Sequence, residues 1–149
     1  MDDIVEAITA GRVTEVKIVL TSVATALAFY QVFLMSVGYG KLRLAFLDPT
    51  PASASHRAIG DTIALLTLLV AIMCLSFFEV EDGIEHAARG ERGRVLVHVI
   101  GGFSLLGILG LKIVVVRWWH ALGKALPVLG LSVLALFVLI WVTSVGAYL

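Results

Sequence analysis

The residues of this chain that are best suited to bind a metal are its four histidines, His56, His86, His98 and His120. His86 lies in a charged stretch and is expected to be solvated. His98 lies about one helical turn inside an apolar run, where an ionisable side chain is costly and normally faces a protein interior. Two imidazoles, or an imidazole and a thioether, on opposite faces of a flat ring are common ligands of a b-type haem. Haem binding is therefore the chemistry that these residues could support.

One predicted haem site combines His98 with Met73, which lies at a similar depth in the preceding apolar run. Gly101 and Gly102 lie close to His98 and would let a flat ligand approach the backbone. A thioether is a weaker donor than a second imidazole, so this ligand pair predicts a raised reduction potential. The alternative interpretation of Met73 is an ordinary core side chain.

A second predicted site lies on the opposite side of the membrane and combines His56 with His120. His56 begins one apolar run and His120 ends the next, and we expect these two runs to pack antiparallel. Lys112, Arg57 and Arg117 would then neutralise the haem propionates. In the alternative interpretation, His56 only flanks a helix, and His120 belongs with the two tryptophans before it to an aromatic and basic membrane anchor.

Lys112 has other interpretations, because it lies inside an apolar run. Its side chain could extend to the interface, or it could pair with Asp61 at similar depth, as a structural pair or as part of an ion pathway. Gln31, in the middle of the first run, could line a pocket or hydrogen-bond across helices. On a helix, Lys112 shares one stripe, expected to face inward, with several residues: His98, Gly102, Leu105, Leu109, Val116 and His120.

The elements that must position these residues follow from the composition. Of the 149 residues, 60% are hydrophobic and only 15% are charged, whereas soluble chains carry about 25% charged residues. Four continuous apolar runs, each long enough to cross a hydrocarbon core of about 30 Å as a helix, cover residues 16–39, 56–78, 95–119 and 125–149. The sequence therefore predicts an all-α fold, an integral membrane four-helix up-and-down bundle that forms a single domain over residues 1–149. Pro127 is expected in the first turn of the fourth helix.

Cysteine content and charge exclude several classes of protein. Cys74 is the single cysteine, which excludes an internal disulfide and a multi-cysteine metal site. The formal net charge is zero, so no electrostatic argument supports nucleic-acid binding. Four spans place both termini on one side, where acidic residues gather while Lys and Arg divide evenly. This small bias favours extracytoplasmic termini for a protein of the cell membrane.

Several short motifs carry a resemblance to a known family: HRAIG and LLVAIMC in the second run, RVLVHVIGG and LKIVVVRWW in the third, and LPVLG and IWVTS in the fourth. Over about residues 55–145 the chain resembles a family of small, uncharacterised bacterial four-helix membrane proteins. That family is distantly similar to cytochrome b and ferric-reductase membrane domains. The resemblance implies that members of the family have histidines at the positions of His56 and His98 and a basic residue at the position of Lys112. Many of them would have a histidine where this chain has Met73. Either Met73 replaces that histidine as a ligand, or the site is lost.

The function predicted from these features is that of a small b-type cytochrome with one or two haems. It would pass electrons between a quinone or a reductase and a partner protein in the lipid bilayer. The alternative from a different class is a haem-free anchor, assembly or interaction subunit of an oligomer or larger membrane complex. Such a subunit would use its glycine-rich helix faces to bind other helices.

Overall fold

The computed structural model describes residues 12–42, 49–77 and 91–145. Within these ranges the chain forms four α-helices, named α2 (Val13–Gly38), α3 (Pro49–Phe77), α5 (Arg92–Arg117) and α6 (Leu126–Val145). A short 3₁₀ helix, η1 (His120–Ala125), connects α5 to α6, and the described residues contain no strand. The all-α prediction is confirmed. All four helices are long and apolar enough to cross a membrane.

The helix boundaries differ from the predicted spans mainly at the start of α3. This helix begins at Pro49 rather than at residue 56, because a proline in the first turn needs no hydrogen bond for its missing N–H. Residues 49–55, which precede the predicted span, therefore belong to α3. Helix α6 begins at Leu126, so Pro127 does lie in its first turn, as predicted.

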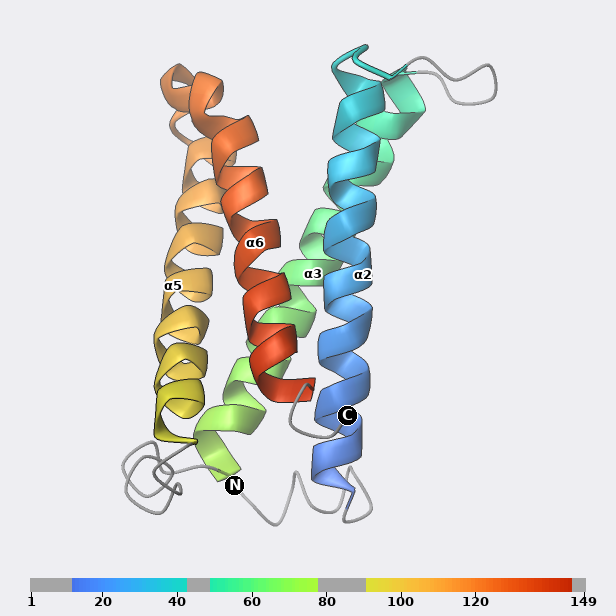
Figure 1. The fold of residues 1–149 in the computed structure, drawn as a ribbon. Helices are drawn as coiled ribbons and strands as arrows, with labels where there is room; N and C mark the ends of the chain where they lie inside the picture. The colour runs from blue at the N-terminus through green and yellow to red at the C-terminus, as the bar shows by residue number, and fades with distance from the viewer. Residues whose placement is uncertain (1–11, 43–48, 78–90, 146–149) are drawn as a thin grey trace.

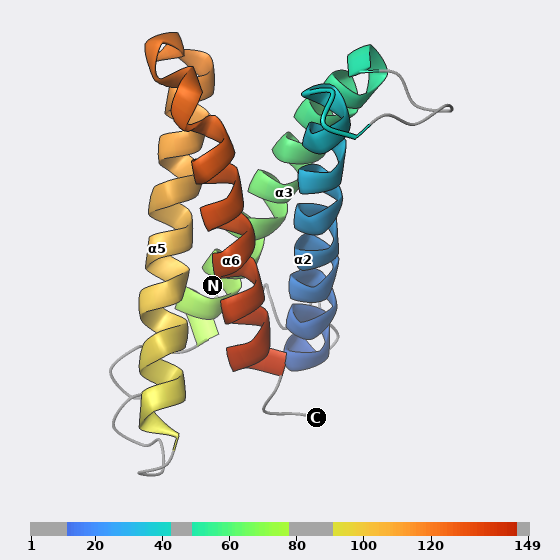
Figure 2. The same cartoon turned by 45° about the horizontal axis from the view of Figure 1, so that its top comes forward.

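The four helices run alternately up and down, and they form two antiparallel hairpins (Figure 1). Helix α2 packs against α3, and α5 packs against α6. The two hairpins join mainly through α2 and α6, whereas α3 and α5 contact each other only sparsely. The second and third spans, α3 and α5, run antiparallel as expected (Figure 1), but their contact is sparse because the hairpins meet mainly through α2 and α6. Both views show the hairpins diverging toward the end that holds η1 and the start of α3 (Figure 2).

The hydrophobic core lies where all four helices meet. Its buried side chains come from α2, α3, α5 and α6: Ala24, Ala28, Ile63, Leu105, Leu109, Val133, Phe137 and Ile140. A hydrogen bond of 2.9 Å from Trp141 Nε1 to Ser22 Oγ also joins α6 to α2. This contact and the core fix the two hairpins relative to each other.

The predicted inward stripe of α5 is observed over most of its length. Leu105 and Leu109 are buried, and His98 and Lys112 are half-buried. Val116 departs from the prediction, because its side chain is exposed while its neighbour Val115 is buried. The inward face of α5 therefore shifts by one residue toward its end.

Candidate cofactor-binding cavity

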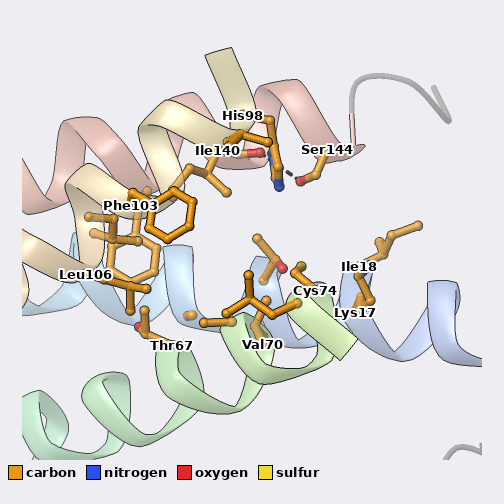
Figure 3. A pocket seen from close by; sticks show the side chains of 18 of the residues that line it. Lys17, Ile18, Thr67, Val70, Cys74, His98, Phe103, Leu106, Ile140 and Ser144 are labelled. Carbon is orange, nitrogen blue, oxygen red and sulfur yellow. Dashed lines mark hydrogen bonds between the residues drawn. The ribbon is translucent and has the colours of Figure 1, made fainter. Parts of the chain in front are cut away.

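A cavity of about 330 Å³ lies between the four helices, near the end that holds the start of α2 and the end of α6. Its wall is mostly apolar. Side chains from α5 and α3 face each other across it (Figure 3), while α2 and α6 close its remaining sides.

His98 is the imidazole that lines this cavity. Its Nδ1 atom lies 3.1 Å from Thr143 Oγ1. The Thr143 hydroxyl has one hydrogen, and it donates that hydrogen to main-chain carbonyls of its own helix, at 2.9 Å from Leu139 O and 3.1 Å from Ile140 O. With its hydrogen directed to its own helix, the hydroxyl can accept from His98, and the hydrogen of the neutral imidazole is then on Nδ1. Nε2 keeps its lone pair and is able to bind a metal or accept a hydrogen bond.

Two basic side chains also line this cavity, Lys17 from α2 and Arg94 from α5. Arg94 donates a hydrogen bond to Thr143 O at 3.2 Å and pairs with Glu91 at 3.1 Å. Arg94 thus packs against the same turn of α6 that orients His98. Both basic residues lie near the start of their helices, at the same end of the bundle (Figure 1). The cavity therefore combines an apolar wall with positive charge at one end.

Of the adjacent residues Met73 and Cys74 on α3, only Cys74 lines the cavity. Thr67, Val70, Ala71, Cys74 and Leu75 line it from α3, and Met73 is not among them. Met73 is buried elsewhere, with 3% of its surface exposed. Adjacent residues of a helix point about 100° apart, so similar depth did not place Met73 on the same face as the cavity. The structure does not bring Met73 and His98 together there.

The two glycines near His98 have different surroundings. A Cβ atom added to Gly101 would lie 3.5 Å from Ile140 and 3.6 Å from Leu139, so Gly101 packs against α6. A Cβ atom at Gly102 would meet no atom within 4 Å, and Gly102 lines the cavity. Only Gly102 therefore leaves room for a ligand.

A polar cluster of Gln31, His56 and Lys112 occupies the other half of the bundle. Gln31 is 6% exposed; its Nε2 donates to His56 O at 2.6 Å, and its Oε1 accepts from Lys112 Nζ at 3.5 Å. His56 Nδ1 lies 3.3 Å from Gln31 O, a carbonyl that can only accept. His56 therefore also carries its hydrogen on Nδ1 and keeps a lone pair on Nε2. The cluster joins α2, α3 and α5.

The remaining predicted site residues are less closely grouped. Asp61 lies 3.7 Å from Arg117 at the surface, so the recorded partner of Asp61 is not Lys112. Arg57 is exposed on α3. His120 is the first residue of η1, but its side chain lies outside the described part of the structure, and the predicted pairing with His56 stays a prediction. Among the described residues, no three side chains of His, Cys, Asp or Glu gather as a metal site would require.

Comparison with known proteins gives a family for the chain. The model of DUF6529, a family of unknown function, matches residues 4–149. The chain belongs to this family. No curated protein and no solved structure matches it. The family match confirms the resemblance to uncharacterised proteins, and it gives no support to a relation with cytochrome b.

Sequence reasoning missed four residues of this site in this DUF6529 member. Lys17, Cys74 and Arg94 line the cavity, and Thr143 contacts His98. Thr143 belongs to a hydroxyl pair near the end of α6, and only the packing of α6 on α5 brings it to His98. A polar residue near the end of an apolar helix is a weak signal by itself. Cys74 could have been found only from the rotation of α3 about its axis, since it adjoins Met73 in the sequence.

Proposed function

We propose that this protein spans a membrane as a four-helix bundle and binds one b-type haem in the cavity that His98 lines, for electron transfer. Membrane insertion is supported by large apolar side chains that remain exposed on the outer faces of the helices. Examples are Leu65 at 68%, Ile100 at 57% and Val128 at 66% exposed. In water such a surface would aggregate, whereas in a bilayer it meets lipid chains.

The observation that carries the proposal is the orientation of His98. An imidazole that is held through Nδ1 by Thr143 has the lone pair of Nε2 available for iron, and such supporting hydrogen bonds commonly orient metal-binding histidines. The apolar wall would exclude water from the ring. Lys17 and Arg94 would neutralise the propionates at the positive end of the cavity.

The donor set fits a haem that has one imidazole ligand from the protein. Haem needs no cluster of three protein ligands, because the porphyrin supplies four nitrogens. Met73 does not line the cavity, so a thioether from that position is not part of the proposal. When bound, the haem would supply the one-electron chemistry, and the protein would supply the ligand, the burial and the charge. A lipid-soluble donor such as a quinone, or a reductase partner, would deliver the electron.

The experiment is a reduced-minus-oxidised visible spectrum of the purified chain in mild detergent. We expect the bands of a b-type haem in the wild type and in Met73→Leu, and their loss in His98→Ala. Met73→Leu is the matched control, because it changes a buried side chain that does not line the cavity. A wild-type chain without haem bands after expression with adequate haem supply would contradict the proposal. Unchanged bands in His98→Ala would remove His98 as the ligand.

A second candidate function is that of a haem-free subunit that binds other membrane helices. It is favoured by Gly107 and Gly110, which are exposed on α5 and whose added Cβ atoms would meet nothing within 4 Å. Small residues on a helix surface let a partner helix approach closely. A chain without haem, in which Gly107→Cys forms a cross-link to another helix in membranes, would favour this function.

A further inference from the structure

The polar cluster of Gln31, His56 and Lys112 is not used by the proposed haem site, and its geometry calls for a separate explanation. Lys112 lies in an apolar helix, yet its Nζ atom is directed across the bundle to Gln31 on α2. It lies five residues before Arg117, or about 7.5 Å along the axis from the end of α5. The ammonium therefore lies within the apolar part of the bundle, between the two hairpins.

No acidic side chain is recorded as a partner of Lys112 within the described residues. Its hydrogen bond goes to a neutral amide oxygen, and the distance of 3.5 Å is at the outer limit for such a bond. Asp61, the acid at similar depth, pairs instead with Arg117, and 79% of its side chain is exposed. An ammonium in apolar surroundings without a counter-charge is costly. A bound anion would relieve that cost.

Gln31 holds this arrangement in place through both ends of its amide. Nε2 donates to the main-chain oxygen of His56, and Oε1 faces Lys112. Gly60 leaves space for this amide, because a Cβ atom there would lie 2.9 Å from Gln31 Nε2 and the amide would have to shift. The cluster thus joins side chains of three helices, and the long side chain of Lys112 ends beside Gln31.

We propose that Lys112, positioned by Gln31, binds the phosphate of an anionic phospholipid headgroup between the two hairpins. The hairpins diverge toward this end (Figures 1 and 2), and the depth of Lys112 lets its long side chain meet a phosphate near the interface. Basic positions between membrane helices are typical sites for anionic headgroups. A lipid is preferred over a free anion because the site lies within the apolar spans, where a ligand with acyl chains is stabilised by its own burial.

The test compares lipids bound to the purified full-length chain in a neutral detergent. Dioleoyl-phosphatidylglycerol, dioleoyl-phosphatidylcholine and inorganic phosphate are added separately at matched concentrations. Native mass spectrometry measures the lipid retained, and the thermal unfolding midpoint measures stabilisation. The variants are Lys112→Met, Lys112→Arg and, as a matched control, Lys124→Met, which removes an exposed lysine of η1.

We expect the wild type to retain about fivefold more phosphatidylglycerol than phosphatidylcholine, the effect of one lysine near a membrane surface. Lys112→Arg and Lys124→Met should keep this preference, and Lys112→Met should abolish it. Equal retention of the two lipids by the wild type would overturn the proposal without any variant, even if Lys112→Met fails to fold. So would a preference that survives in Lys112→Met, or stabilisation by inorganic phosphate equal to that by phosphatidylglycerol. None of these measurements depends on haem.

Discussion

The hydroxyl of Thr143 determines what His98 can do, because a hydroxyl has one hydrogen to donate. That hydrogen goes to a carbonyl of α6, and the imidazole consequently donates from Nδ1. The same arrangement recurs at His56, whose Nδ1 faces a main-chain carbonyl of α2. At both positions an oxygen of a neighbouring helix fixes the tautomer and leaves Nε2 as the acceptor.

Thr143→Val should therefore remove the acceptor for His98 Nδ1–H while preserving the shape of the side chain. We expect the free energy of unfolding to fall by about 1 kcal/mol, and the affinity for haem to fall roughly 10- to 100-fold. Denaturant unfolding in detergent and haem titration measure the two effects. Thr143→Ser should behave as the wild type. Thr62→Val is the control, because the Thr62 hydroxyl is exposed and bonds only to its own helix. Equal losses in the Thr143 and Thr62 variants would refute the role of Thr143.

Residue depth was accessible from the sequence, whereas rotation about the helix axis was not. Counting along apolar runs predicted that His98 and Lys112 face the interior, because ionisable groups avoid lipid. Whether Met73 or Cys74 faces the cavity depends on the rotation of α3 about its own axis. That rotation depends on how α3 packs against α2. The partner of Lys112 was likewise unpredictable, since Gln31 and Asp61 both lie at a suitable depth and only the packing decides between them.

The two hairpins are the structural units at the scale of elements, and the α2–α6 contact unites them. Within each hairpin, adjacent helices are neighbours in sequence, which a short connection makes favourable. The contact between α2 and α6 joins the first and last helices of the described chain. Trp141 and Ser22 form the polar part of this contact.

A double-mutant cycle on this pair tests how much the hydrogen bond contributes. Trp141→Phe and Ser22→Ala should each destabilise the chain, and the double variant should lose less than the sum of the two. We expect a coupling energy of about 0.6 kcal/mol, the average for such bonds between membrane helices. Unfolding of the four proteins in detergent gives the coupling. Strictly additive losses would mean that the bond in the structure contributes nothing.

The up-and-down order of helices is the property of the whole molecule that composition and periodicity predicted best. Long apolar runs separated by polar stretches leave few alternatives in a bilayer, because every backbone polar group must be paired inside its own helix. The sequence did not predict which helices occupy the centre. All four are similarly apolar, so no pattern distinguished the close α2–α6 contact from the sparse α3–α5 contact.

Membrane topology follows from this order and can be measured directly. Val13 and Val145 lie at the same end of the bundle (Figure 1). Reporters fused to the two termini should therefore give the same side, which we expect to be extracytoplasmic. A reporter inserted between α2 and α3, within residues 43–48, should give the opposite side. Termini on opposite sides would contradict a four-span membrane protein.

The division into two hairpins also has a consequence for biosynthesis. A chain emerging from the ribosome releases α2 and α3 before α5 and α6, and helices inserted into a bilayer associate after insertion. The first hairpin can form at once, because its contacts are internal to it. The face of α2 that will meet α6 must then wait for the last helix of the described chain. Until α6 is made, Ser22 lacks its partner Trp141, and the cavity lacks the wall that α6 supplies. The cavity is therefore completed last, and any cofactor that it takes can be enclosed only after α6 has been translated.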